Sequence, residues 1–580
     1  MTQLAWRLVK DYWTSNEKWS AWRLLLAVLV LNLGTVYISI GINQWNNAFY
    51  NALQSFNKGE LFRQIGVFCV LVSLAIAASV YALYLKQMLQ LRWRDWLTRR
   101  YLSAWLADRA YYRLQLSNTT DNPDQRISDD LNQFTAYLLS LSLGLVTSVV
   151  SLVSFLVILW RLSGPMPIPL GQWGTMHIPA YLVWAALLYN GVGTWLAVKI
   201  GRPLVPLNVE QQRVEADFRF SLVRLRENAE SIALCCGEPA ELGIFHERFR
   251  SVFKNFRHIM KSQRSLSCFT LGYTQVAVIF PLVVVSPRYF WNQIGWGGLM
   301  QAVNAFSFVQ NSLSFIINSY SDIAAWQAVT QRLNDFEERL VAIRQPTRTP
   351  RQIVVRRGDF GVAVKEVDLD LPDGTPLLRG VGFAALYGEA LLIAGPTGVG
   401  KSTLLRAIAG IWPFGRGEVR LGKGQILFVS QRPYLPLGTL VDALLYPHMG
   451  SGGYSTARLT AVLEEAGLGA LTAKLEVVDN WPQRLSLGEQ QRLAFARILL
   501  TQPALLFMDE ATSALDEDSE AQIYSLLRTA PWRPTLVSVG HRSTLQNFHD
   551  QILDLSAFCP RGQSPPVRNL FLESTLCQTF

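Results

Sequence analysis

An eight-residue glycine-rich segment has the residue types and spacing to bind phosphate. It reads GPTGVGKS between an apolar run at 389–394 and a helix-forming run at 403–409, which is the strand, turn and helix order of a phosphate-binding loop. In such a loop glycines let backbone N–H groups approach the phosphates, the lysine reaches the β- and γ-phosphates, and the serine hydroxyl is placed for Mg²⁺. The predicted nucleotide-binding residues here are Gly395, Pro396, Thr397, Gly398, Val399, Gly400, Lys401, Ser402 and Thr403.

Two adjacent carboxylates, Asp509 and Glu510, follow the apolar run at 505–508. An aspartate at the end of a strand can hold Mg²⁺ through water, as Ser402 can from the glycine-rich loop. The glutamate beside it is placed to polarise an attacking water. The loop and the carboxylates together predict hydrolysis of a nucleoside triphosphate with Mg²⁺ as the metal.

The rest of the chain has the composition of a membrane protein. Half of its 580 residues are hydrophobic and only 17% are charged, which is too apolar for a soluble protein. The net charge of +10 comes from basic residues beside apolar stretches, which indicates a lipid bilayer and not nucleic acid as the partner. Stretches near the ~20 residues that a spanning helix needs lie at 22–42, 62–85, 138–160, 179–200 and 269–291, and a more polar sixth lies at 297–324.

Basic residues gather in alternate connections between these stretches, after the second and after the fourth. Connections rich in lysine and arginine stay in the cytoplasm. The nucleotide-binding half must be cytoplasmic as well, so the number of spans is even and six satisfies it. This predicts that both termini are cytoplasmic.

The predicted fold class is multi-domain: an all-α six-span transmembrane domain followed by an α/β P-loop nucleotide-binding domain. Residues 1–23 mix tryptophans with basic residues and predict a helix in the membrane interface. The transmembrane domain, with long cytoplasmic helical extensions, is expected at 24–340. A linker is expected at 341–351, and the nucleotide-binding domain at 352–580, where short β-rich runs begin.

The sixth stretch carries a polar stripe, because small polar residues recur in it at intervals of three and four. On a helix this spacing places them on one face about 25 Å long. The stripe faces either a water-filled cargo path or neighbouring helices that it holds by hydrogen bonds, and a cavity is the favoured alternative. Its members are Asn304, Ser307, Asn311, Ser314, Asn318 and Ser321, of which the three asparagines are the candidate cargo contacts.

The ordered motifs of the C-terminal half resemble the ATP-binding cassette family. Besides the glycine-rich loop and the two carboxylates they are LSLGEQQR at 485–492, SALD at 513–516, Gln431 after a strand, and His541. The resemblance implies ATP as the nucleotide, and Ser486 and Gly488 as the signature that caps the γ-phosphate of ATP on another subunit. It also implies that Gln431 and His541 sense and stabilise that phosphate as catalytic residues with Glu510, and that Gln431 is a Mg²⁺ ligand beside Ser402 and Asp509. One cassette and one set of spans imply a half-transporter that works as a homodimer.

Two departures from the family pattern concern nucleotide binding. In the signature motif Leu487 replaces a glycine and Glu489 replaces a glutamine, but Ser486 and Gly488 remain, so function is expected to survive. The aromatic residue that stacks on adenine is replaced by Leu371, which is expected to weaken selectivity for the base.

Segments NPDQRI at 122–127 and EADFRF at 215–220 resemble bacterial SbmA/BacA-like transporters with a fused cassette, and the peroxisomal and lysosomal half-transporters of subfamily D. Residues near 215–238 are then expected to couple the two domains. The resemblance implies ATP-driven uptake of bulky hydrophilic or amphipathic cargo, such as cobalamin or peptides, across a bacterial inner membrane. Alternatives are a fatty acyl-CoA or lipid transporter, an exporter, and, from another class, an ATP-gated channel or regulator.

Overall fold

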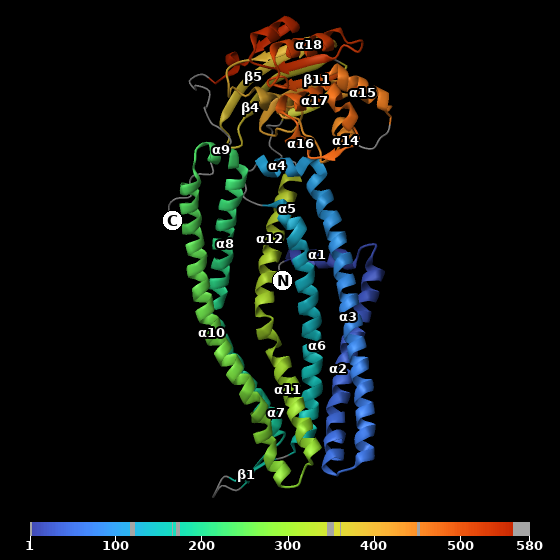
Figure 1. The fold of residues 1–580 in the computed structure, drawn as a ribbon, viewed down its shortest axis with the longest axis vertical. Helices are drawn as coiled ribbons and strands as arrows, with labels where there is room; N and C mark the ends of the chain where they lie inside the picture. Colours follow the sequence, from blue (N-terminus) through green and yellow to red (C-terminus); the bar gives the residue numbers. More distant parts are fainter. Residues whose placement is uncertain are drawn as a thin grey trace. The chain divides into compact units, whose positions relative to one another are not determined.

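The chain forms two compact units, Met1–Ala107 with Thr120–Ala342 (unit 1) and Asp108–Thr119 with Ile343–Phe580 (unit 2) (Figure 1). The computed structural model describes residues 3–116, 122–164, 166–169, 175–344, 353–359, 361–448 and 453–560. A helical unit is followed by an α/β unit, which confirms the predicted fold class. Most of the predicted linker 341–351, and residues 561–580 of the predicted nucleotide-binding domain, lie outside the described residues.

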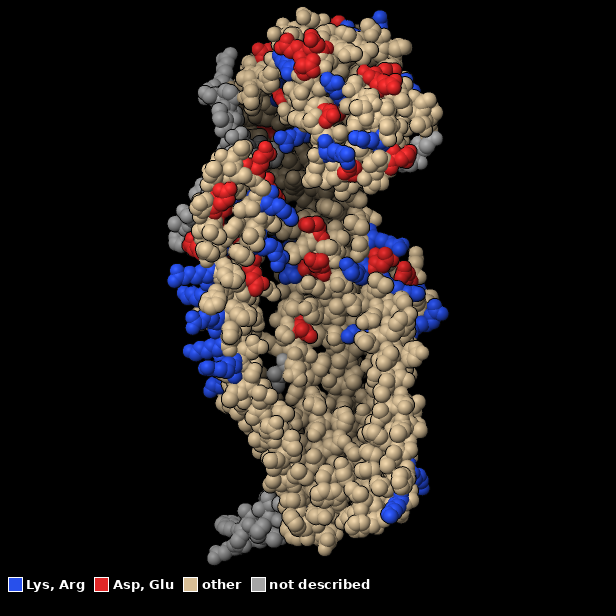
Figure 2. Space-filling model, viewed as in Figure 1, with Lys and Arg blue, Asp and Glu red and all other residues tan. Residues whose placement is uncertain are grey.

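Unit 1 consists of long helices, and among the described residues five are long and apolar enough to cross a membrane. They run over Lys18–Gln54, Lys58–Leu116, Pro123–Ser163, Tyr181–Glu227 and Glu238–Phe290, and each contains one of the five predicted apolar stretches or nearly all of it. Figure 2 shows very few charged side chains over the lower half of this unit. Apolar residues of the long helices, such as Val70, Ile76 and Leu188, are more than half exposed, as expected for helices that lipid surrounds.

The helices of unit 1 also include shorter and more polar members. Two strands of 4 residues each, β1 (Met166–Pro169) and β2 (Thr175–Ile178), pair antiparallel and lie between two of the long helices in the chain. The helices are α1 (Gln3–Trp13), α2 (Lys18–Gln54), α3 (Lys58–Leu106), α5 (Pro123–Gln125), α6 (Leu131–Ser163), α7 (Tyr181–Gly201), α8 (Leu204–Glu227), α9 (Ala229–Leu234), α10 (Glu238–Phe290), α11 (Trp296–Asn318) and α12 (Tyr320–Arg344).

The polar sixth stretch forms α11, which packs against α2, α6, α7 and α10. Its 23 residues extend about 35 Å, which is enough to cross the hydrocarbon of a bilayer. A ladder of amides on α2 holds it. Asn43 donates to the Gln301 carbonyl at 3.0 Å, Asn47 donates to Oε1 of Gln301 at 2.6 Å, and the amide of Gly297 donates to Asn51 at 3.0 Å. The N–H donors of these groups, which lipid would not solvate, are therefore paired between the two helices.

The polar stripe lies on a different face of α11 from the one that packs. Leu299, Ala305 and Val309 are 4%, 0% and 0% exposed, whereas Asn311 and Asn318 are exposed and Asn304 is half-buried. Among the described residues none of these three asparagines is hydrogen-bonded to another helix. These three asparagines therefore form no hydrogen bond to the other described helices of the chain, which leaves water or a second chain as the partner of their amides.

A buried carboxylate fixes the packing of α12 in unit 1. Asp130 is 1% exposed and ends a π-helical turn, Arg126–Asp130, between α5 and α6. Arg126 contacts it at 2.7 Å, and Arg332 on α12 makes two bonds to it, at 2.7 and 3.0 Å. A charge this deeply buried is stable only when it is paired, so the contact fixes how α12 lies on the NPDQRI segment.

Unit 2 contains a five-stranded parallel sheet in the order β13-β6-β12-β11-β8 and a four-stranded sheet in the order β3-β7-β4-β5. The strands of the first are β6 (Ala390–Ala394), β8 (Ile426–Val429), β11 (Leu505–Asp509), β12 (Thr535–Val539) and β13 (Gln551–Asp554). Those of the second are β3 (Ile353–Gly358), β4 (Val362–Asp370), β5 (Pro376–Ala385) and β7 (Gly415–Gly422), and β9 (Gly438–Thr439) pairs with β10 (Val478–Asp479).

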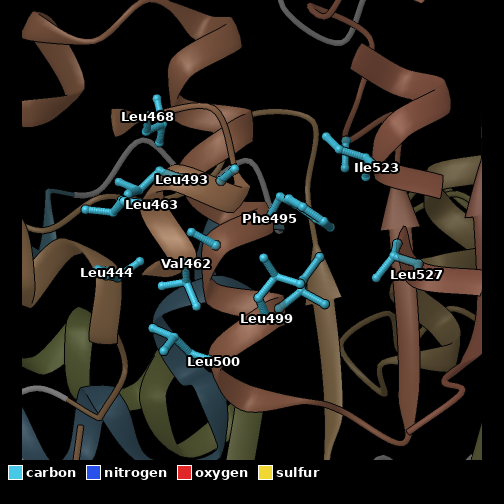
Figure 3. Packing of buried hydrophobic residues seen from close by; sticks show 14 of the residues in the cluster. Leu444, Val462, Leu463, Leu468, Leu493, Phe495, Leu499, Leu500, Ile523 and Leu527 are labelled. Carbon is cyan, nitrogen blue, oxygen red and sulfur yellow. The ribbon is translucent and has the colours of Figure 1, made fainter. Parts of the chain in front are cut away.

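The helices of unit 2 bury apolar faces against the parallel sheet and one another. Figure 3 shows Leu493, Phe495 and Leu499 of the signature helix, which is α17 and follows Ser486, packed among leucines and valines of neighbouring helices. The signature helix therefore has its position set by the core. These helices are α4 (Ala110–Leu116), α13 (Lys401–Ile408), α14 (Leu440–Leu445), α15 (Thr456–Glu465), α16 (Trp481–Arg484), α17 (Leu487–Thr501) and α18 (Glu517–Thr529).

We predict that Asp130→Asn lowers the stability of the folded protein by about 3 kcal/mol, because it removes a buried negative charge that two arginines contact. Thermal unfolding in detergent measures the loss. Asp95→Asn is the matched control, since the Asp95 pair with Arg99 is exposed and should contribute less than about 1 kcal/mol. Equal unfolding temperatures for the two variants would contradict the role given to Asp130.

Candidate functional site

The glycine-rich loop joins the end of β6 to the start of α13. Gly398 and Gly400 have φ angles of 82° and 106°, a region that a residue with a side chain rarely adopts. A Cβ on Gly400 would also lie 2.9 Å from Leu377. The Lys401 ammonium donates to the carbonyls of Gly395 at 2.8 Å and Pro396 at 3.1 Å, so it folds over its own loop. The N-terminus of α13 presents backbone N–H groups at the place where the sequence predicts phosphate.

The Ser402 hydroxyl donates to Oδ1 of Asp509 at 2.9 Å, which connects the loop to the end of β11. Burial raises the pKa of Asp509, and the Ser402 bond only partly offsets this. Burial likewise lowers the pKa of Lys401, against the pull of Glu510 and Asp509. The Lys401 ammonium is therefore placed to bind a phosphate, and the Asp509 carboxylate is placed to bind a cation.

Three loops meet at the carboxylate of Glu510. The Gln431 side chain, which follows β8, donates to its Oε2 at 3.0 Å, and Nε2 of His541, which follows β12, lies 3.1 Å from its Oε1. The amide of Glu510 donates to the Val539 carbonyl at 3.1 Å. Its φ of 49° is left-handed, a strain of about 1–3 kcal/mol of the kind that occurs at functional sites. The three residues predicted to be catalytic are thus in direct contact.

The signature residues begin α17. The Ser486 hydroxyl accepts from the Glu489 amide at 3.3 Å, and the Glu489 carboxylate accepts from the Ser486 amide at 2.9 Å, which is a capping box. Glu489 therefore satisfies the helix end in place of the usual glutamine. Among the described residues no hydrogen bond joins Ser486 or Gly488 to the glycine-rich loop.

Leu371 lies in the turn between β4 and β5, where its amide donates to the Thr375 carbonyl at 2.8 Å. Its side chain is half-buried and packs on the core that includes Leu377. The asparagines 304, 311 and 318 belong to unit 1, so the structure does not bring them to the nucleotide residues.

Sequence reasoning missed residues that hold the loops in place. Gln491 bonds to Gln431 and to the SALD segment, and Arg542 donates to the Leu515 carbonyl at 2.8 Å. Gln491 and Arg542 lie close in sequence to the predicted site residues Gly488 and His541, which was a signal of their importance. The sequence did not show which groups they would contact. A second omission is α4, which groups with unit 2 through Arg109, whose guanidinium donates to the Ala409 carbonyl at 3.1 Å, and through Leu116 in the core.

Comparisons with known proteins agree with this geometry. Residues 8–290 match the family described as ABC transporter transmembrane region 2, and residues 378–513 match the family described as ABC transporter. The chain is 36% identical to ABC transporter D family member 2, chloroplastic, of Arabidopsis thaliana, covering 96% of this chain and 86% of that one. It is 34% identical to the inner membrane ABC transporter ATP-binding protein YddA of Escherichia coli (strain K12), covering 95% and 97%.

Two more distant comparisons were found. The human lysosomal cobalamin transporter ABCD4 is 28% identical, covering 93% of this chain and 92% of that one. The structure of a bacterial Atm1-family ABC exporter with ATP bound shares the fold, with a TM-score of 0.70 at 20% identity, covering 92% of this chain and 93% of that one.

We predict that Leu371→Tyr tightens ATP binding by roughly 1 kcal/mol, because an aromatic ring stacks on adenine better than an aliphatic chain. Titration of the purified protein with ATP and GTP measures the change and the preference. Leu386→Tyr is the control, since Leu386 is 56% exposed and precedes β6 at the edge of the sheet away from the glycine-rich loop. Unchanged ATP affinity in Leu371→Tyr would place this residue away from the base.

Proposed function

The chain belongs to the ABC transporters, in the group related to the D family, and we propose that two copies of it couple ATP hydrolysis to uptake of bulky hydrophilic or amphipathic cargo across a bacterial inner membrane. As a member it is a multi-pass membrane protein with an ATPase domain coupled to transport. The cargo, the direction, the membrane and the identity of the second copy are the proposed parts.

The convergence of Gln431 and His541 on Glu510 is the observation that carries the proposal. A carboxylate beside the loop that holds the γ-phosphate can orient or deprotonate water, and groups bonded to both of its oxygens keep it in one place. A channel that ATP only gates has no need of this arrangement. Mg²⁺ would supply Lewis-acid stabilisation of the phosphates, and the oxygen donors Ser402 and Asp509 suit it.

Two further features support a homodimer. Among the residues that the structure describes, neither Ser486 nor Gly488 is hydrogen-bonded to the glycine-rich loop of its own chain, as expected if they serve the ATP of a partner. The second feature is an apolar stripe on the part of α10 that precedes its predicted span, where side chains about half exposed recur at intervals of seven, four, three and four. Water does not favour such a face, and a second copy would cover it. Its members are Leu242, Phe249, Phe253, Phe256 and Met260.

The proposed cargo follows from the polar stripe and from the relatives. Asn311 and Asn318 are exposed on α11, so they can offer amides to a hydrated cargo. The human relative is named a cobalamin transporter, and peptides are the other cargo proposed here. Reconstitution into vesicles, with cobalamin and peptides offered outside, tests the proposal by stimulated ATP hydrolysis and by accumulation inside. Accumulation of neither cargo would reject both.

We predict that Glu510→Gln retains ATP binding but lowers turnover on the order of 10²-fold or more, because the amide cannot act as a base. Phosphate release by the purified protein measures it. Glu517→Gln is the matched control, an exposed glutamate at the start of α18 that should keep the wild-type rate. Hydrolysis by Glu510→Gln at the wild-type rate would remove Glu510 from the mechanism.

We predict that the triple change Asn304→Leu, Asn311→Leu and Asn318→Leu abolishes transport and its stimulation of ATPase while basal hydrolysis stays near wild type. The cavity wall would become apolar, but no bond between helices of the chain would be lost. Transport and ATPase assays in vesicles measure both. If the stripe instead joins two copies, unpaired partner groups would cost about 0.6 kcal/mol each, and folding yield and basal ATPase should fall together.

Cysteines placed singly at 304, 311 and 318 separate these outcomes, after the native cysteines have been replaced. A water-soluble thiol reagent should modify all three. Phe306→Cys and Leu313→Cys are the controls, since Phe306 is 2% exposed and Leu313 packs in the core of unit 1. Protection of all five positions would reject the cavity.

A further inference from the structure

Gln491 is a buried polar side chain on α17 that three hydrogen bonds satisfy. It is 3% exposed. Its Nε2 donates to the Gln431 carbonyl at 2.9 Å and to the Ser513 hydroxyl at 3.4 Å, and its Oε1 accepts from the Ala514 amide at 3.0 Å. One side chain thus joins the loop after β8 to the segment after β11.

The pattern of these bonds needs a side chain with both a donor and an acceptor, as a primary amide has. The Gln431 carbonyl needs a donor, and the Ala514 N–H needs an acceptor. A carboxylate has no donor for the carbonyl, and an aliphatic or thioether side chain satisfies neither group. A protonated carboxylic acid, however, has one O–H donor and one carbonyl acceptor, so it could replace the two shorter bonds.

Both segments that Gln491 holds also contact Glu510. The Gln431 side chain donates to the Glu510 carboxylate at 3.0 Å, and the Ser513 amide donates to the Glu510 carbonyl at 3.1 Å. Arg542, next to His541, also donates to the carbonyls of Leu515 and Ser513 and contacts the Glu520 carboxylate at 3.3 Å. The segment at 513–515 is therefore held from two elements.

We infer that Gln491 is a positioning residue for ATP hydrolysis, which keeps Gln431 and the 513–515 segment in the register that aims Glu510. The inference rests on the proposed ATPase mechanism and adds a residue to it. Gln491 does not touch the predicted phosphate site, so it acts on turnover and not on ATP affinity. Arg542 also donates hydrogen bonds to the 513–515 segment, but the Gln431 carbonyl accepts its bond from Gln491.

The test uses the full-length protein in vesicles and the variants Gln491→Met and Gln491→Glu. Gln491→Met keeps the length of the side chain and removes all three bonds, so kcat should fall about tenfold or more while the KM for ATP stays within about twofold. Gln522→Glu is the matched control for added charge, since Gln522 is exposed on α18 and should behave as wild type.

Gln491→Glu gives a readout that a purely structural role would not. Burial raises the pKa of a carboxyl group, so at low pH this side chain is protonated and can restore the bonds to Gln431 and Ala514. The other charged groups around the segment, Glu510, the Arg492 pair with Asp516, and Arg542 with Glu520, are the same in both variants. The ratio of its kcat to that of wild type should therefore rise at least threefold between about pH 8.5 and pH 6, while the ratio for Gln491→Met stays flat.

Wild-type kcat in either variant throughout this pH range would overturn the inference. So would an equal fall in both without any pH dependence, because the loss would then come from packing. If Gln491→Met does not fold, the pH dependence of Gln491→Glu decides alone. Failure of the proposed function would give a different result: wild-type protein and Glu510→Gln would release phosphate at the same rate.

Discussion

The order of strands in the parallel sheet is the constraint on which the nucleotide site depends. Parallel strands end at one edge, and the order β6-β12-β11-β8 brings the glycine-rich loop, His541, Glu510 and Gln431 to that edge from segments up to about 150 residues apart. The bonds at Glu510 form only because these strand ends are neighbours. If the strands had another order, the same motifs would be present in the chain, but their residues would not meet at one site.

Much of this site was readable from the sequence, because each motif combines a local conformation with a chemical group. The glycines, Lys401, Ser402, Asp509 and Glu510 fall at a turn or a strand end that short-range pattern predicts, and the order of the motifs resembles one family. Gln491 was not predicted, because its partners lie in two distant loops and two of them are backbone groups. No periodicity of α17 names them, and only the folded core fixes the helix that carries this side chain.

The transmembrane unit was predictable to a similar depth for the same reason. The five predicted apolar stretches lie in long helices, and the more polar sixth stretch forms α11. The amide ladder of Asn43, Asn47 and Asn51 was not foreseen, because a four-residue spacing on α2 has meaning only once α2 and α11 are neighbours. The grouping of α4 with unit 2 was missed as well, since seven residues carry too little pattern to show where they pack.

The pairing of Asp130 with Arg332 sets an order of events during synthesis on the ribosome. Arg126 lies four residues away and can screen the carboxylate as soon as this stretch is made, but Arg332 emerges about 200 residues later. Until then a carboxylate that ends 1% exposed has half of its counter-charge, so the helices around it cannot close fully. Full pairing of this buried carboxylate therefore waits for α12, the last helix of unit 1 along the chain.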